Sequence, residues 1–361
     1  MNKLNNDILK KAEIEALFNL YLYLMNIFTP KTKQTMQEIV WELEVLQEEK
    51  PDKYSGRDVV KLKILKNAIK NNDFFATSKL KDFACSENGL TAAMFIKPDN
   101  SISIAYRGTG CGEWIDNGEG LSGIAEENTY MTYGHDSAKP FIHTVFRDYA
   151  TDQQVEALNW FNYILSKHKV QNSKITVSGH SKGGNKAQFI AMKSGDVDFC
   201  FSFDGQGFSP EAIQSMKNIM GTQHQNRRKK IYSICADNDY VNVLGNQLPL
   251  VEQTYYFKSI SGIHSLESIL QKDGTFNPQC EQGKLSVYVQ TISEEIMSLS
   301  PFVRQYATLG IMNIFQKHLG KCETVNGDAV SIEKTIAGIS IAAGIFLNHL
   351  RKSKKDTFII N

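Results

Sequence analysis

The stretch Val177-Ser178-Gly179-His180-Ser181-Lys182-Gly183-Gly184 decides the fold of this chain. The β-branched run 175–177 leads into it, and a helix-compatible stretch, 185–192, follows. A Gly-x-Ser-x-Gly pattern between a strand and a helix predicts a tight, strained turn that projects the Ser181 hydroxyl from a sheet. Glycines flank the serine because a Cβ there would clash with the neighbouring strand and helix. The start of the helix would also bring backbone amides close to any negative charge that develops at this serine.

Strand and helix signals alternate on both sides of this turn. Two apolar runs, 90–96 and 101–106, flank the turn residues Pro98-Asp99-Asn100 and predict a hairpin. Thr151-Asp152-Gln153-Gln154 fits a capping box at the start of a helix. Further strands are expected at 197–203, 231–235 and 254–257, and the strand at 254–257 is expected to be the last. A helix is expected to begin at Pro210, between the first two of them. Such alternation predicts an α/β fold, with a mostly parallel central sheet covered on both faces.

The rest of the chain is organised around that sheet. Residues 1–75 show helical apolar periodicity and are expected to form a helical N-terminal extension. Residues 76–275 would form the α/β catalytic domain, with an irregular lid at about 111–139, and residues 276–361 a helical C-terminal region.

Composition excludes several classes of protein. The 361 residues are 42% hydrophobic and 22% charged, with a net charge of +1, so no global field favours a nucleic-acid partner. The six cysteines show no paired or zinc-binding spacing and are expected to be reduced thiols, and no secretory signal is visible at the first residues. These features favour a cytoplasmic protein, with export without a signal left open.

One segment near the end of the sequence bears on membranes. Residues 335–350 contain no charged residue, and the basic run Arg351-Lys352-Ser353-Lys354-Lys355 follows. The segment is shorter than the roughly 20 residues that cross a bilayer. A buried helix with a solvated basic tail is the first interpretation, and an interfacial helix at 335–355 that contacts a membrane peripherally is the second.

A serine hydroxyl needs a base to take its proton and an acid to orient that base. In a triad of the chain order serine, acid, histidine, the base follows Ser181. His224 stands beside a basic run that indicates a surface loop, and His318 and His349 stand in expected helices beyond the last strand. His264 follows the last expected strand in a loop, and is therefore the predicted base.

The acid should leave a strand between the serine and the histidine. Asp237 and Asp239 both follow the strand 231–235, and Asp204 follows the strand before it. Asp237 could instead form the turn through its own side chain. The residues alone leave these three aspartates open.

An oxyanion hole needs two donors. The amide of Lys182, next to the nucleophile, supplies one. The segment Tyr106-Arg107-Gly108-Thr109-Gly110 ends an early strand, and Thr109 is expected to supply the other. Arg107 is expected to pin this loop through an ion pair.

These motifs together resemble the class 3, fungal-type lipases. Ile104-Ala105-Tyr106-Arg107-Gly108-Thr109 with Trp114-Ile115-Asp116 is similar to their Arg-Gly-Thr/Ser and Trp-x-x-Asp signature, and Asn238-Asp239-Tyr240-Val241 to their acid motif. The resemblance covers roughly residues 90–270, and Asp204-Gly205-Gln206-Gly207-Phe208 resembles an uncharacterised bacterial branch of lipase-like proteins. It implies an α/β-hydrolase with Ser181 as nucleophile, Asp239 as acid, His264 as base, and Thr109 with Lys182 as oxyanion donors.

The chain departs from that family in three ways. Lys182 replaces the usual apolar residue after the serine and predicts a cation beside the acyl site; the secretion signal is missing; and the helical ends lie outside the family core. In the lid position, Trp114 and Leu121 are expected to cover an acyl-binding groove, and His180 to lie beside the substrate.

The predicted function is hydrolysis of carboxylic esters, of lipid, acylglycerol or phospholipid type, through an acyl-enzyme on Ser181, with no metal or organic cofactor. One alternative is a catalytically silent, lipase-like binding or scaffold protein. Another is a (phospho)lipase effector exported without a signal.

Overall fold

A computed structural model gives the arrangement of the chain. It describes residues 3–28, 30–86, 89–109, 114–124, 127–133, 140–146, 149–170, 172–259 and 264–319, and then 336–338, 340–341, 343–345 and 347.

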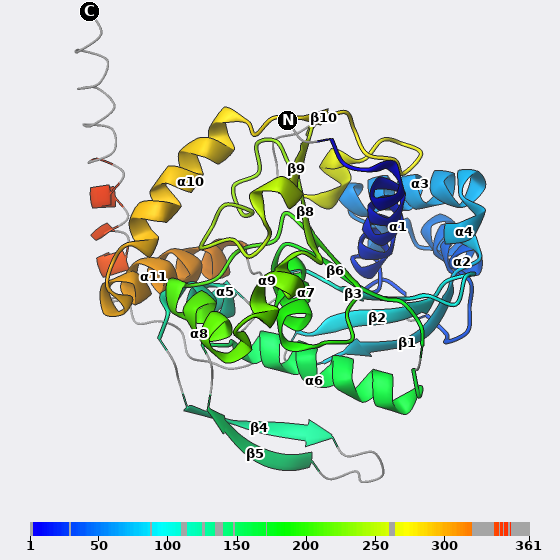
Figure 1. Cartoon of the computed structure of the whole chain (residues 1–361). Coiled ribbons are helices and arrows are strands. Elements are labelled where there is room, and N and C mark those ends of the chain that lie inside the picture. The colour runs from blue at the N-terminus through cyan, green and yellow to red at the C-terminus, as the bar shows by residue number, and fades with distance from the viewer. Residues whose placement is uncertain are drawn as a thin grey trace, which may run out of the picture.

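A mostly parallel sheet forms the centre of the molecule (Figure 1). Its order within the described residues is β1-β2-β3-β6-β7-β8-β9-β10. The five strands from β3 to β9 pair in parallel, whereas β1, β2 and β10 pair antiparallel at the two edges. The strands are β1 (Lys79–Cys85), β2 (Thr91–Ile96), β3 (Ile102–Tyr106), β6 (Ile175–His180), β7 (Phe199–Phe203), β8 (Ile231–Ala236), β9 (Thr254–Phe257) and β10 (Gln279–Cys280). The predicted α/β class and the predicted hairpin are confirmed, but β10 shows that β9 is not the last strand.

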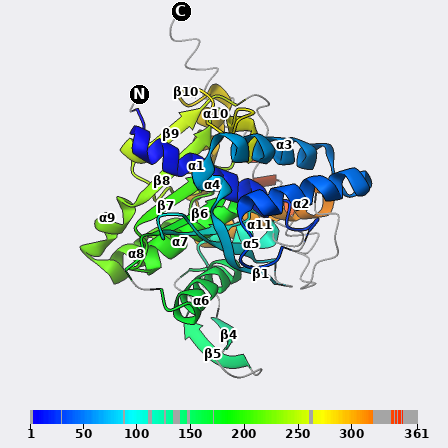
Figure 2. The same ribbon diagram turned by 90° about the vertical axis from the view of Figure 1, so that its right-hand side faces the viewer.

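The N-terminal helices cover one face of this sheet. Their side chains share one hydrophobic cluster with alternate residues of the strands, such as Phe95, Phe201 and Ile234. Figures 1 and 2 show these helices in blue on one side of the strands. They are α1 (Asn6–Leu22), α2 (Met36–Glu49), η1 (Pro51–Lys53), α3 (Gly56–Asn71) and α4 (Asp73–Ala76). Residues predicted as an extension therefore supply a layer of the core.

Helices that connect the parallel strands cover the other face. Their cluster includes Phe161 and Ile190 together with the strand residues Ile104 and Val177. The helices are α6 (Asp152–Lys167), α7 (Lys182–Lys193), α8 (Pro210–Met220) and α9 (Gln223–Arg228), and short turns η2 (Val251–Gln253) and η3 (Leu266–Ile269) border β9. Thr151 caps α6 in a complete capping box, as the sequence predicts.

The region predicted as an irregular lid contains regular structure. It includes α5 (Trp114–Ser122), and β4 (Glu127–Tyr133) pairs with β5 (Pro140–Phe146) in a hairpin that projects from the body (Figure 1). The prediction of an irregular loop is wrong at these residues, because α5 gains tertiary partners that local sequence does not reveal. Residues 111–113, 125–126 and 134–139 lie outside the described part.

Two C-terminal helices pack beside α5. They are α10 (Lys284–Met297) and α11 (Pro301–Leu319), and Ile296, Met297 and Ala307 form a hydrophobic cluster with Leu121 of α5. The segment 335–355, which joins the uncharged run to the basic run, falls largely outside the described residues. Among the residues that are described, no helix combines the length and the apolar character needed to span a bilayer.

Candidate active site

Ser181 occupies a sharp turn between β6 and α7. Its backbone has φ 60° and ψ −127°, a region that costs a residue with a side chain on the order of 1–3 kcal/mol. Two glycines make the turn possible. A Cβ on Gly179 would lie 2.1 Å from the carbonyl carbon of Gly183, and a Cβ on Gly183 would lie 2.0 Å from the carbonyl oxygen of Tyr106. This is the strained geometry of a nucleophile elbow.

Asp239 and His264 meet at the carboxyl end of the sheet. Nδ1 of His264 lies 2.6 Å from Oδ2 of Asp239. The other carboxylate oxygen, Oδ1, accepts hydrogen bonds from the amides of Val241 at 2.7 Å and Asn242 at 3.0 Å. Since both oxygens of Asp239 have partners, its carboxylate is fixed toward the imidazole of His264.

Asp237 points into a different set of partners. Its carboxylate accepts hydrogen bonds from Lys258 Nζ at 3.1 Å and from the amide and hydroxyl of Ser259 at 3.1 and 2.9 Å. Burial raises its pKa, but the bonds from Lys258 and Ser259 outweigh that effect and hold the pKa below its usual value. Asp237 therefore joins the ends of β8 and β9.

Asp204, the third candidate acid, is fully buried after β7. Its Oδ1 accepts a hydrogen bond from the amide of Ala236 at 2.8 Å. Burial, and then the nearby charge of Asp239, raise the pKa of Asp204 well above its usual value. A neutral carboxyl group cannot stabilise an imidazolium as an ionised one does.

His264 stacks on His180, the residue before Ser181. The ring centroids are 4.8 Å apart and the planes differ by 22°. In the described part of the chain, the buried Nε2 of His264 has no hydrogen-bond partner, so no bond joins it to Ser181. Catalytic hydrogen bonds in structures without substrate are often long and tighten only in the complex.

Two imidazoles and a carboxyl group gather here, and these are groups that bind metals. Three possible ligand atoms lie within 4.8 Å of one another, one from each of His180, Asp204 and His264. Tetrahedral zinc, with bonds of about 2.0–2.1 Å, needs its ligand atoms about 3.3 Å apart. Stacked rings also direct their lone pairs side by side rather than toward one point, so the arrangement fits a metal ion poorly.

The other histidines lie elsewhere. His224 is buried in α9, so the expected surface loop is wrong at this residue. His318 belongs to α11, and His349 lies outside the described residues.

The loop that carries Thr109 packs directly against the elbow. A Cβ on Gly108 would lie 2.8 Å from the carbonyl oxygen of His180 and 3.0 Å from Cβ of Ser181. Asn117 of α5 donates a hydrogen bond to the Thr109 hydroxyl at 3.0 Å. Lys182 begins α7, where amides have no acceptor within the helix. Arg107, predicted to pin the loop through an ion pair, donates a hydrogen bond to Asn26 at 2.6 Å.

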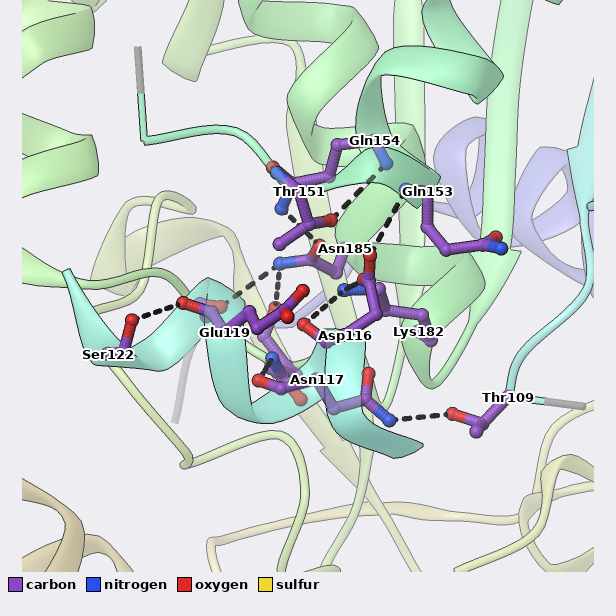
Figure 3. A network of polar contacts seen from close by, with 12 residues as sticks. Thr109, Asp116, Asn117, Glu119, Ser122, Thr151, Gln153, Gln154, Lys182 and Asn185 are labelled. Atoms are coloured by element: carbon purple, nitrogen blue, oxygen red, sulfur yellow. Dashed lines mark hydrogen bonds and ion pairs between the residues drawn. The ribbon is translucent and has the colours of Figure 1, made fainter. Parts of the chain in front are cut away.

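The side chain of Lys182 is buried and forms an ion pair with Asp116 (Figure 3). The amide of Gln153 donates to Oδ1 of Asp116 at 3.1 Å, which ties α5 and α6 to the same carboxylate. The sequence interpretation of a cation beside the acyl site is therefore wrong, because the ammonium group is neutralised beneath α5. In the sequence, Asp116 stands out only as part of a motif, and no pattern links it to Lys182.

Beneath α5, further polar contacts continue this network. Gln206 donates to the carbonyl of Asn117 at 3.0 Å, and Asn185 donates to the carbonyls of Gln206 and Gly207 at 3.2 and 3.0 Å. Trp114 starts α5, and Leu121 is buried in the cluster with α10 and α11. Leu121 thus packs against helices rather than standing on a free loop.

The chain is similar to a protein family and to solved structures of lipases. A family model described as Mbeg1-like matches residues 80–244. Among solved structures, a fungal lipase–inhibitor complex is similar at 11% identity and a TM-score of 0.39, over 75% of this chain and 97% of that chain. A triacylglycerol lipase from Penicillium expansum is similar at 10% identity and a TM-score of 0.28, over 59% and 85%. A search of curated proteins gives no match.

Proposed function

We propose that this chain is a serine hydrolase that cleaves carboxylic esters through an acyl-enzyme on Ser181. The contact of 2.6 Å between His264 Nδ1 and Asp239 Oδ2, next to a serine at φ 60°, is the observation that supports it. A base oriented by a carboxylate and a nucleophile on a strained turn are the two parts that acyl transfer requires.

The chemistry follows from these groups. His264 Nε2 takes the proton of the Ser181 hydroxyl while Oγ attacks the ester carbonyl. The amides of Thr109 and Lys182 hold the resulting oxyanion. The tetrahedral intermediate then collapses, and His264 gives its proton to the departing alcohol. A water molecule, deprotonated by His264, releases the carboxylic acid and restores Ser181.

We propose that the substrate is a lipid ester, either an acylglycerol or a phospholipid. We also propose that residues 335–355 contact a membrane peripherally. The uncharged run 335–350 and the basic run 351–355 support this, since together they suit an anionic surface.

A labelling experiment tests the reaction. A fluorophosphonate probe should label the folded wild type and leave Ser181→Ala unlabelled. Ser166→Ala, which removes an exposed serine of α6, is the matched control and should label like wild type. A series of p-nitrophenyl esters of increasing acyl length then measures the size of the acyl pocket, with Ser181→Ala as the blank.

The second candidate is a lipase-like binding protein without activity. Among the described residues, Nε2 of His264 has no hydrogen-bond partner, and this favours the second candidate. Folded wild type that resists the probe, with and without detergent, and hydrolyses no ester of the series would decide for this candidate.

A further inference from the structure

Tyr23 reaches the active site from the N-terminal helices. It follows α1 as its C-terminal cap, and its hydroxyl lies 2.6 Å from Nδ1 of His180. The two rings meet edge to face, with centroids 5.7 Å apart and planes at 73°. Tyr23 thus contacts His180, the residue next to Ser181, although the two lie 157 positions apart in the sequence.

The contact continues to the base. His180 stacks on His264, and Nδ1 of His264 in turn contacts Asp239. Tyr23, His180, His264 and Asp239 therefore form one continuous series of contacts. Its outer members, Tyr23 and Asp239, each approach one imidazole through Nδ1.

The helix that precedes Tyr23 is fixed on the sheet, and the Tyr23 ring has close neighbours. Glu15 of α1 is buried against the sheet and accepts hydrogen bonds from Ser103 of β3 and from Ser178 of β6, the latter at 2.9 Å. The ammonium group of Lys61 lies 5.7 Å from the centroid of the Tyr23 ring. The glycine at 108 leaves room for the hydroxyl, since a Cβ there would lie 2.5 Å from it.

His180 can connect Tyr23 with His264 in this series of contacts because its imidazole stays uncharged. Burial lowers its pKa well below the usual value, and the nearby His264 and Lys61 lower it further. A neutral imidazole has one donor and one acceptor nitrogen. The Tyr23 hydroxyl contacts Nδ1 and can either donate to it or accept from it, so this contact fixes the position of the ring rather than its tautomer.

We propose that Tyr23 is a positioning residue of the active site, which acts through His180 to fix the orientation of the His264 ring toward Ser181. The proposal rests on the proposed hydrolase function for its kinetic consequence. It makes the N-terminal helices part of the catalytic apparatus rather than an appendage.

The test compares Tyr23→Phe with Tyr21→Phe in the full chain. Both remove one hydroxyl from a tyrosine at the end of α1, but the buried Tyr21 hydroxyl has no hydrogen-bond partner among the described residues. Tyr23→Phe should lower kcat for a p-nitrophenyl ester between about tenfold and about a hundredfold, as expected when a catalytic group is misplaced. KM should stay near wild type and the melting temperature should fall by a few degrees, because Nδ1 of the buried His180 loses its partner. Tyr21→Phe should leave kcat and KM unchanged.

A cycle with His180→Gln shows whether Tyr23 acts through His180. If it does, Tyr23→Phe adds nothing to the loss of kcat in the His180→Gln background. Losses that multiply in the double variant would overturn the proposal, as would a Tyr23→Phe enzyme with the kcat of wild type.

A spectroscopic measurement separates this proposal from the proposed function. The proton between His264 Nδ1 and Asp239 should give a downfield resonance that Asp239→Asn abolishes. Tyr23→Phe should broaden it by loosening the ring, and Tyr21→Phe should not. An inactive wild type with this behaviour would refute the hydrolase and leave the positioning contact standing. An unchanged resonance in Tyr23→Phe would refute the positioning contact, whether or not the protein hydrolyses esters.

Discussion

The carboxylate of Asp239 contacts His264 at 2.6 Å, whereas that of Asp237, two residues earlier, is bound by Lys258 and Ser259. Both residues follow the end of strand β8, but their side chains have different roles. One orients the imidazole, and the other closes the turn beside β9.

This difference predicts unequal effects of two matched substitutions. Asp239→Asn should lower kcat by roughly 10⁴, because the amide favours the wrong tautomer of His264 and cannot stabilise its charged form. Asp237→Asn should leave kcat close to wild type and reduce the free energy of unfolding by about 0–1 kcal/mol, since Lys258 is exposed. Steady-state kinetics and urea unfolding of both variants check this. A larger kcat loss in Asp237→Asn would reverse the assignment.

The ion pair of Lys182 with Asp116 predicts a stability effect beneath α5. Lys182→Met should cost about 3–5 kcal/mol of unfolding free energy, because it leaves a buried carboxylate without its counter-charge. Adding Asp116→Asn should recover much of that loss, since the amide is neutral and can still accept the bond from Gln153. Urea unfolding measures both variants, with Lys193→Met, also in α7, as the control. A single variant as stable as wild type would contradict the contribution of the pair.

The sequence predicts those features of the fold that depend on residues close together in the chain. The turn at Ser181 follows from two glycines that pack against backbone, and the start of α6 from the capping box at Thr151. The contact of Asp239 with His264 agrees with the order of residues that the family resemblance suggested. The parts that were missed depend on partners distant in the chain. The Lys182–Asp116 pair spans 66 positions and the Tyr23–His180 contact 157, and neither leaves a periodic signal.

Glu15 links α1 to the sheet directly beneath the elbow, so its removal tests the N-terminal layer. Besides Ser103 and Ser178, its carboxylate contacts the ammonium group of the buried Lys97 at 3.3 Å. Glu15→Ala should cost about 3–5 kcal/mol of unfolding free energy, because the buried Lys97 loses the carboxylate with which it is paired and, among the described residues, keeps only the interaction with the charge of Asp99. Chemical unfolding measures the loss, with Glu49→Ala at the exposed end of α2 as the control. Equal stability of the two variants would show that the N-terminal layer does not depend on this carboxylate.

We expect that replacing Asp204 by asparagine increases the stability of the protein in a pH-dependent way. Burial, followed by the charge of Asp239, holds its folded-state pKa well above the value of about 3.9 that an unfolded aspartate has. Between these two values the folded state binds more protons than the unfolded state, so the free energy of unfolding falls as pH rises through this window. Asp204→Asn removes the ionisable group, retains an oxygen for the amide of Ala236, and tolerates the backbone φ of 46° at this position.

The variant should therefore be more stable than wild type at pH 7, by about 2–4 °C in melting temperature for each kcal/mol gained. The gain should shrink as pH falls and disappear below about pH 4, where the unfolded aspartate is protonated as well. Thermal unfolding at pH 3.5, 5, 6 and 7 measures it, with Asp52→Asn, exposed in η1, as the control. A loss of stability at every pH would mean that Asp204 is an ionised and partnered carboxylate, and a kcat lowered by the substitution would return Asp204 to the candidates for the catalytic acid.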